Sequence, residues 1–396
     1  MRDSDPITSA AFFDFLQDFE DDSRAGELRS LTTYLARYPE AESEIAAEYV
    51  RRTGSQSLLS EDPNDDEADE EPESARRYRL IRPLGQGGQG TVYLAEDKRL
   101  GREVALKQLD GRWITKTRRL RFQREAEIVA RVEHPSIAEV LDADFESATP
   151  FLVMRYVKGF DLARLLRAES EGAASGALTL PPADPDALDS VLRYFEETAR
   201  ALHVAHEAGV VHRDVKPGNL MVTQDGSPCV LDFGLAIEAN GESLTREGEG
   251  LGTPEYMAPE QVSSSAGSVD RKTDVHALGL VMYESLTGRR PFEGSTVHEI
   301  HRAVLDHERP RLTGSFGRHG RDLGIVVATA MERDPTRRYA SALALAEDLR
   351  RVRATEPILA RPAGPWLQFR RWVQREPALS TAVFVLIASL SVGLIL

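Results

Sequence analysis

The sequence predicts an α+β protein, in which the chain contains both strand-like and helix-like segments. Apolar stretches of strand length are concentrated before residue 155, at 78–81, 91–95, 104–107 and 151–154. Longer stretches in which apolar residues recur at helical spacing follow at 188–207 and 275–286. Between the two groups lies the short stretch 155–159, where we expect a hinge between two lobes.

The composition narrows the classes of protein. With 396 residues, of which 41% are hydrophobic, the chain has room for one large or two ordinary globular domains. The net charge of −15 disfavours a nucleic-acid partner. The single cysteine, Cys229, excludes a disulfide framework and a cysteine-based zinc site, and it favours a reducing, intracellular compartment. We expect no N-terminal signal peptide, because the chain opens on an acidic segment.

Residues 1–53 predict a small helical unit. Apolar side chains crowd its first part and then recur at helical spacing: Phe12, Phe13, Phe15, Leu16 and Phe19, followed by Leu28, Leu31, Leu35 and Tyr38. Two interpretations remain open. The unit is either a helical hairpin that packs on itself or on the next domain, or a docking helix that presents its Phe cluster to an unknown partner.

Residues 54–77 predict an acidic, disordered linker. Its part 61–73 contains nine Asp or Glu residues and no Lys or Arg, so it cannot bury enough apolar surface to order itself. We interpret it as a solvated spacer, with a regulatory acidic arm as the alternative.

A glycine-rich motif follows the first strand of the central region, with Gly85, Gly87 and Gly90 in the pattern G-x-G-x-x-G. In dinucleotide-binding proteins such glycines lead into a helix. Here they lead into the predicted strand 91–95. A strand, a glycine turn and a second strand form a hairpin whose backbone N–H groups can cover the phosphates of ATP. An ordinary glycine-rich hairpin is the alternative.

Lys107 ends the apolar strand 104–107. A buried lysine is costly unless it is paired, whereas an edge lysine would extend into solvent. The helix predicted at 118–133 offers Glu125 and Glu127, which point to different faces. We choose Glu125 as the partner, because it lies about one turn from Phe122 on the apolar side.

The stretch 212–219 places a carboxylate, an ammonium and an amide within six residues, between a helix end and a short strand. A second carboxylate follows another apolar run. Transfer of a phosphoryl group needs a carboxylate to orient a hydroxyl, a cation near the phosphate oxygens, and oxygen ligands for Mg²⁺. Asp214, Lys216, Asn219 and Asp232 supply this set in order.

Other stretches predict no chemistry. We expect the Pro-rich stretch 169–186 to be a surface insertion. His203, His206 and His212 would allow a metal site on paper, but no cysteine or carboxylate is spaced to complete it, so we expect structural histidines.

Together these motifs resemble the eukaryotic-like (Hanks-type) serine/threonine protein kinases of bacteria, over residues 78 to about 352. The resemblance implies a two-lobed protein kinase fold at residues 78–353, with a small β-rich N-lobe and a large helical C-lobe. The matching motifs are Gly85-x-Gly87-x-x-Gly90-x-Val92, Val104-Ala105-Leu106-Lys107, Glu125, His212-Arg213-Asp214 with Asn219, Asp232-Phe233-Gly234 and Ala258-Pro259-Glu260.

The resemblance also implies ATP and Mg²⁺ (or Mn²⁺) as cofactors, with a role for each matched residue. Asp214 would accept the proton of the substrate hydroxyl, and Lys216 would stabilise the transferred phosphoryl group. Asn219 and Asp232 would ligate the metal. Lys107, paired with Glu125, would hold the α- and β-phosphates. The other nucleotide-binding residues would be Leu84, Gly85, Gln86, Gly87, Gly88, Gln89, Gly90, Val92, Ala105, and the backbone of Arg155 and Val157 at the adenine.

The activation segment 232–260 carries the hydroxyls Ser243, Thr245 and Thr253. We expect Thr253 to contact the catalytic loop, and we favour Thr245 for autophosphorylation, because a phosphate on the activation segment could organise Arg213 beside the catalytic base. The nearby glutamates Glu247 and Glu249 could partly replace such a phosphate.

Later residues are expected to be structural. Glu260 would pair with Arg338, and Asp274 would anchor the backbone of the catalytic loop. Two positions depart from the family pattern. His276 stands where an aromatic residue is common, and Arg155 stands where Glu is common, which could alter hinge or ribose contacts.

The C-terminus predicts a membrane anchor. Residues 354–377 form a basic juxtamembrane segment with Trp366 and Trp372, and residues 378–396 run nineteen positions without a charge. Such a helix is ~28 Å long, about the thickness of the bilayer's hydrocarbon core. The flanking arginines predict a cytoplasmic kinase domain on a single-pass protein of the cell (inner) membrane. A buried core helix is the alternative, and the sequence leaves open a tail anchor or a longer protein with a sensor on the far side.

The sequence therefore predicts a membrane-anchored serine/threonine protein kinase that acts on protein substrates, is capable of autophosphorylation and is a possible dimer. Two rivals remain, a pseudokinase scaffold and a small-molecule phosphotransferase. The stretch 252–260, which would shape a groove for a protein substrate, disfavours the second.

Overall fold

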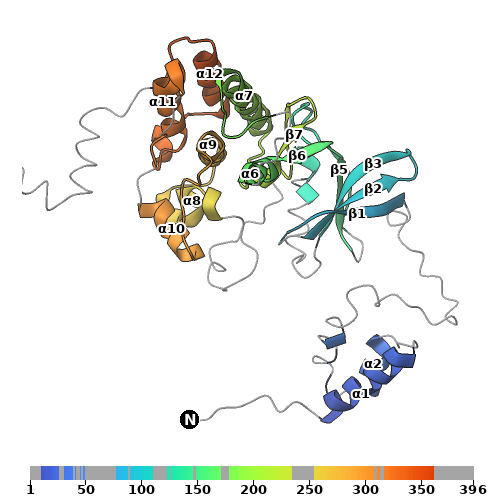
Figure 1. Ribbon diagram of the computed structural model, residues 1–396. Helices are drawn as coiled ribbons and strands as arrows, with labels where there is room; N and C mark the ends of the chain where they lie inside the picture. Colours follow the sequence, from blue (N-terminus) through green and yellow to red (C-terminus); the bar gives the residue numbers. More distant parts are fainter. Residues whose placement is uncertain are drawn as a thin grey trace, which may run out of the picture. The chain divides into compact units, whose positions relative to one another are not determined.

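The structure is a computed structural model, and Figure 1 shows its arrangement. It describes residues 10–25, 31–38, 41, 45, 48–49, 77–87, 90–109, 123–124, 126–145, 149–170, 178–233, 254–306, 310–312 and 316–360. The chain divides into two compact units, Met1–Glu71 and Pro72–Leu396.

The first unit packs on itself. It contains α1 (Ala10–Ala25) and α2 (Leu31–Arg37), and its buried side chains are Phe15, Phe19, Tyr34, Ala41, Ile45 and Tyr49. The rings of Phe15 and Tyr34 meet edge to face, 5.2 Å between centroids. Phe15 and Phe19 are thus enclosed within the unit, which favours the self-packing hairpin over a helix that presents these rings to a partner.

The small lobe of the second unit is an antiparallel sheet in the order β1-β2-β3-β5-β4 (Figure 1). Its strands are β1 (Tyr78–Gly87), β2 (Gly90–Asp97), β3 (Arg102–Leu109), β4 (Val140–Asp144) and β5 (Phe151–Arg155). On one face Tyr78 packs with β2, β3 and β5, and on the other Ala126 packs against β5. Ala126 belongs to the helix predicted at 118–133, of which the structure describes residues 123–124 and 126–129 as helical.

The large lobe is helical and carries a small sheet near its junction with the small lobe (Figure 1). Its helices are α6 (Leu162–Ser170), α7 (Pro185–Glu207), α8 (Pro259–Val262), α9 (Arg271–Thr287), α10 (Val297–Asp306), α11 (Gly320–Ala330) and α12 (Ala342–Arg353). The sheet is formed by β6 (Gly159–Asp161), β7 (Leu220–Thr223) and β8 (Pro228–Val230), and single 3₁₀ turns are η4 (Pro217–Asn219), η5 (Pro254–Tyr256), η6 (Ser264–Ala266), η7 (Gly317–His319) and η8 (Pro335–Arg337). The predicted two-lobed α+β fold is confirmed.

The start of α7 and the burial of two leucines in this lobe differ from the sequence prediction. α7 begins at Pro185, three residues before the predicted Leu188, because the Asp184 side chain accepts a hydrogen bond from the Ala187 N–H and caps the helix. The expectation that 169–186 is a surface insertion is wrong for Leu178 and Leu180, whereas most of the described residues after them up to 186 are exposed. Leu178 and Leu180 are 6% and 1% exposed and belong to the main core.

The two lobes are joined by backbone hydrogen bonds as well as by the chain. The Ala138 N–H donates to the Val230 carbonyl at 2.9 Å, and the Val230 N–H donates to the Ser136 carbonyl at 2.8 Å. This parallel bridge attaches the segment before β4 to β8, the strand that leads to Asp232.

The predicted pair Glu260–Arg338 is confirmed. Its charged groups are fully buried, with Nη1–Oε1 at 2.6 Å and Nη2–Oε2 at 2.8 Å. Such a bidentate pair fixes α8 against the loop before α12, since breaking it would leave a buried charge without a partner.

Among the residues that the structure describes, no helix is both long enough and apolar enough to span a membrane. The predicted helix at 378–396 lies outside that part of the chain.

A pair of helix glycines tests how tightly this core is packed. In Gly279→Ala the new Cβ would lie 2.8 Å from the Ala330 Cβ, so α9 and α11 must move apart, and we expect a loss of about 1–3 kcal/mol in the free energy of unfolding. Gly324 in α11 has no described atom near its Cβ position, so Gly324→Ala should add roughly 0.5–1 kcal/mol. Urea denaturation of both variants measures the difference. Equal midpoints would contradict the expected order of stability.

Candidate active site

The loop between α7 and β7 is anchored by one buried carboxylate. Asp274 of α9 is fully buried, and its oxygens accept hydrogen bonds from the backbone N–H groups of His212 and Arg213, each at 2.8 Å. His206 Nε2 lies 2.7 Å from Asp274 Oδ2. The predicted anchoring role of Asp274 is confirmed, and His206 has a structural role.

The same loop holds a residue in the left-handed backbone region. Arg213 has φ of +66°, a conformation that costs roughly 1–3 kcal/mol for a residue other than glycine. It is held by Asp274 on its N–H side and by Gln261 of α8, whose Nε2 donates to the Arg213 carbonyl at 2.7 Å. The loop conformation is thus imposed by two helices of the large lobe.

Asp214 lies at the centre of a compact polar cluster. Lys216 Nζ lies 2.7 Å from Asp214 Oδ2, and the Asn219 amide donates to the same oxygen at 3.1 Å and to the Asp214 carbonyl at 2.8 Å. These contacts leave the other carboxylate oxygen, Oδ1, without a partner among the described residues. Since Asp214 is 28% exposed, Oδ1 is available to a hydroxyl from outside.

The small lobe contributes Lys107. Its Nζ reaches Asp232 Oδ2 at 3.0 Å, and its side chain is only 6% exposed, so the edge-lysine alternative is wrong. Asp232 also has a left-handed backbone, with φ of +54°. The N–H of the preceding Leu231 donates to the Asn219 carbonyl at 2.9 Å, which holds Asp232 beside the catalytic loop.

The predicted partner Glu125 lies outside the described residues. Glu127, the other glutamate of this helix, is exposed, and its carboxylate accepts a hydrogen bond from Gln123 at 3.4 Å. The apolar side of this helix is as predicted, because Ala126 and Val129 are buried.

Several predicted nucleotide-binding residues share one face of the sheet. Val92 pairs with Gly85 of β1 on one side and with Lys107 of β3 on the other, and Ala105 lies two residues before Lys107. Directly paired residues point to the same face, as do residues two apart. Because Lys107 points to Asp232 of the large lobe, this face borders the junction of the lobes.

The local backbone requires glycine at only one of the three glycine positions of the motif. Gly90 has φ of +140°, and a Cβ there would lie 1.9 Å from the Gln108 carbonyl oxygen, so the hairpin itself requires glycine. At Gly85 and Gly87 a Cβ would meet no described atom within 4 Å, and neither has a positive φ. No contact among the described residues therefore explains these two glycines, whereas the close approach of a ligand to the backbone would.

The rest of the predicted motif extends the strand. Strand β1 runs to Gly87 and not only to Ile81 as predicted, so it includes Leu84 and Gln86. Both side chains are exposed. Gly88 and Gln89 lie outside the described residues.

Arg155, at the end of β5, stabilises the hinge through contacts of its side chain. Its guanidinium donates to the carbonyls of Pro135 and Ile137 at 3.1 and 3.0 Å and lies 3.5 Å from Cys229 Sγ. Burial raises the pKa of the Cys229 thiol, and the nearby Arg155 offsets only part of this. Val157 is buried against Ala138 and Cys229. Arg155, which replaces the usual Glu, therefore ties the end of β5 to the segment before β4 and contacts β8 of the large lobe through Cys229.

The side chains present fit a divalent cation that arrives with a nucleotide. Both N–H donors of the Asn219 amide are engaged by Asp214, so its oxygen is left to act as a ligand, and Asp232 supplies a carboxylate. Mg²⁺ prefers such hard oxygen ligands and completes its shell with phosphates and water. Elsewhere in the described residues, no three His, Cys, Asp or Glu side chains are grouped as a metal site would need.

Sequence reasoning misses the contacts that brace the site. It does not identify Gln261, because a lone glutamine carries no motif. Tyr256 donates to Glu284 Oε2 at 2.5 Å, and burial is the main cause of the raised pKa of Glu284. The predicted hydroxyls Ser243, Thr245 and Thr253 lie outside the described residues.

Comparison with known proteins gives concordant matches. The sequence model of the family described as protein kinase domain matches residues 78–348. The serine/threonine-protein kinase PknL of Mycobacterium tuberculosis (strain CDC 1551 / Oshkosh) is 37% identical over 277 residues, which cover 70% of this chain and 65% of PknL. PknA of strain H37Ra is 36% identical, covering 70% of this chain and 62% of PknA.

The fold comparison agrees. A crystal structure of the PknI kinase domain of M. tuberculosis is 28% identical with a TM-score of 0.54, and it covers 70% of this chain and 96% of that chain. The chain spans less than two thirds of the length of the curated relatives PknL and PknA. The family match over residues 78–348, with the two-lobed fold and the assembled polar cluster, shows that this chain belongs to the protein kinase family.

Proposed function

We propose that this chain is an ATP-dependent protein kinase that phosphorylates serine and threonine residues of proteins. The observation that carries this proposal is the convergence of Asp214, Lys216, Asn219 and Asp232 at the junction of the lobes, with Lys107 added from the small lobe. The names of its relatives, serine/threonine-protein kinases PknL and PknA, support the same activity.

Asp214 orients the substrate hydroxyl. Its Oδ2 is fixed by Lys216 and Asn219, so that Oδ1 accepts the hydroxyl proton as the reaction proceeds. When bound, ATP and its Mg²⁺ supply the transferable phosphoryl group and neutralise part of its charge. Lys216 then has a second use, because an ammonium beside the base also stabilises negative charge on the group being transferred.

Asn219 and Asp232 hold the divalent metal, and Lys107 holds the phosphates that precede the transferred group. The strand face with Val92 and Ala105 covers the nucleotide, and Gly85 and Gly87 let the β1–β2 hairpin approach its phosphates without a side chain in between. The backbone of Arg155 and Val157 would bind the adenine. Glu125 is the proposed second partner of Lys107.

Two rival functions are less well supported. A pseudokinase would lack one of the polar groups above, and all of them are present. A small-molecule phosphotransferase would not need the segment that includes η5 and α8, which is tied to the catalytic loop through Gln261.

We also propose that residues 378–396 cross the inner membrane, with the kinase domain in the cytoplasm. The predicted juxtamembrane segment begins at residue 354, but Ile358 and Ala360 pack against the core of the kinase domain, so we propose that only its remainder, 361–377, lies at the lipid headgroups. Support comes from the uncharged run and its flanking arginines. The chain is a candidate for autophosphorylation at Thr245 and for dimerisation.

The first test concerns Asp214, the proposed catalytic base. Purified full-length Asp214→Asn should lose about 10²–10⁴-fold in turnover of labelled ATP to a generic protein with Mg²⁺, while still binding ATP, because the amide cannot take the proton. Asp225→Asn, on the exposed β7–β8 turn, is the matched control and should match the unchanged protein. Nucleotide binding without any transfer by the unchanged protein would establish a pseudokinase instead.

The second test concerns Thr245. Thr245→Ala should remove the main autophosphorylation site and lower kcat several-fold, because Arg213 would lose its anionic partner. Phosphopeptide mapping and initial rates measure the two effects. Complete loss of phosphate with unchanged rates would show that Glu247 and Glu249 suffice.

The third test concerns the membrane. Removal of residues 378–396 should shift the protein from the membrane fraction to the supernatant of a cell lysate, because the apolar anchor is lost. Removal of residues 1–53 serves as the control and should leave the distribution unchanged. A protein that stays with the membrane without 378–396 would rule out this anchor.

A further inference from the structure

The chain reverses direction at the end of α12. The N–H of Thr355 donates to the Val352 carbonyl at 3.1 Å, and the N–H of Glu356 donates to the Arg351 carbonyl at 2.8 Å. This pattern of bonds is a Schellman cap, whose left-handed position is usually glycine. Here Thr355 occupies it with φ of +57°, an unfavourable conformation for a β-branched residue. Other contacts must therefore hold the turn.

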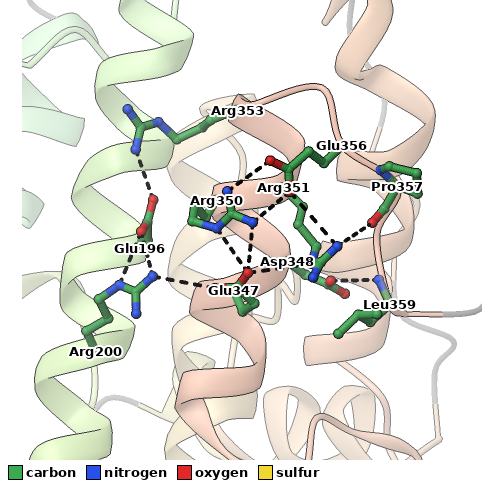
Figure 2. A network of polar contacts seen from close by, with 10 residues as sticks. All are labelled: Glu196, Arg200, Glu347, Asp348, Arg350, Arg351, Arg353, Glu356, Pro357 and Leu359. Carbon is green, nitrogen blue, oxygen red and sulfur yellow. Dashed lines mark hydrogen bonds and ion pairs between the residues drawn. The ribbon is translucent and has the colours of Figure 1, made fainter.

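Those contacts come from a buried carboxylate. Asp348 of α12 is fully buried, and its oxygens accept hydrogen bonds from the N–H groups of Leu359 at 2.7 Å and Ala360 at 2.8 Å, and from the Tyr339 hydroxyl at 3.0 Å. Residues 355–360, which we call the strap, thus run back along α12. Figure 2 shows Leu359 beside Asp348 at the level of the previous helical turns.

Side chains and charges add to the attachment of the strap. Ile358 and Ala360 pack against the main core, whereas Leu359 between them is 66% exposed. Glu356 accepts two hydrogen bonds from Arg350, at 3.2 and 2.7 Å, and Arg351 donates to the Pro357 carbonyl (Figure 2). The exposed ion pairs are individually weak. The buried carboxylate matters more, because without its N–H donors it would be a buried charge that is poorly compensated.

The same helix is bound to α7. Arg353 contacts Asp189 at 2.9 and 3.1 Å and Glu196 at 2.9 Å, and Arg200 of α7 binds Glu196 in turn. Figure 2 shows Arg353, Glu196 and Arg200 of this row between the two helices. The far end of α7 carries His206, which contacts Asp274, the anchor of the catalytic loop. An unbroken series of contacts therefore joins the strap to the loop that holds Asp214.

We propose that the strap is a latch through which the C-terminal part of the chain controls the α7–α12 pair and the catalytic loop beyond it. The strap is the last described segment before the basic stretch 361–377. A force on that stretch, or its binding to a surface, would therefore act on the strap before it acts on the rest of the kinase domain. In the closed latch Asp348 keeps the N–H donors of Leu359 and Ala360, and in the proposed released state it would lose them. Its effect on catalysis rests on the proposed kinase activity.

Two neighbouring residues of different burial, the partly buried Ile358 and the exposed Leu359, provide the test in the full-length protein. Ile358→Asp places a charge against the core and should release the strap, whereas Leu359→Asp places the same charge in solvent and should not. Hydrogen–deuterium exchange followed by mass spectrometry reports on peptides covering 356–360, α7 and the loop 208–219. Kinase assays give kcat and KM for ATP.

In Ile358→Asp we expect faster exchange in the strap, in α7 and in the loop, and a fall in kcat of about 2- to 30-fold, the usual range for such coupling. KM for ATP should change less than about twofold, because the nucleotide contacts lie mainly in the small lobe. Leu359→Asp should match the unchanged protein in hydrogen–deuterium exchange, in kcat and in KM for ATP. If Ile358→Asp does not fold, Glu356→Gln, which removes the charge that pairs with Arg350 and Arg351, should give a smaller change in the same direction.

Two results would overturn the proposal. One is a released strap in Ile358→Asp with exchange in α7 and in the loop unaltered. The other is an equal response to both aspartate substitutions. The exchange measurements need no activity, so a protein without phosphoryl transfer would refute the proposed function and still report on the latch.

Discussion

The geometry of the site depends on the buried carboxylate of Asp274. It projects from α9, a helix whose residues from Thr273 to Leu286 are all buried, so the large lobe fixes its position in the core. Its oxygens hold two successive N–H groups of the catalytic loop and the ring of His206. A buried carboxylate is tolerated only while such donors remain. The need to keep the Arg213 N–H as a donor therefore holds the backbone of Arg213 in its strained, left-handed conformation. The orientation of Asp214 is therefore a property of the core of the lobe, not of the loop alone.

The small lobe completes the site through a different kind of contact. Lys107 reaches across to Asp232, and the lobes are also joined by the backbone bridge near Val230 and by the contact of the Arg155 guanidinium with Cys229. The Lys107–Asp232 pair joins two groups that are both proposed to act on a nucleotide and its metal, whereas the other two contacts involve neither group. A ligand that engages Lys107 and Asp232 therefore need not break the backbone bridge or the contact with Cys229.

Much of this could be predicted from the sequence, because the decisive residues are close in the chain or carried by motifs. The spacing of Asp214, Lys216 and Asn219 and the apolar strands around them are enough to indicate the chemistry. The roles of Asp274 and of the Glu260–Arg338 pair follow from family resemblance. The wrong or missing predictions depend on distant partners. A Pro-rich stretch predicts surface positions for Leu178 and Leu180 because nothing nearby in the chain shows the core that covers them, and neither Gln261 nor Asp348 is marked by any local pattern.

Asp348 of α12 and Asp274 of α9 solve the same physical problem in two helices that both contact α7. Each is a fully buried aspartate whose charge is compensated mainly by backbone N–H groups, from the strap in one case and from the catalytic loop in the other. α7 lies between them, tied to α12 by Arg353 and to Asp274 by His206. Backbone donors fix the path of a segment more strictly than side chains do, because they cannot adopt another rotamer. A displacement at one carboxylate must therefore be absorbed by α7 or passed on, and a helix packed on both sides has little freedom to absorb it.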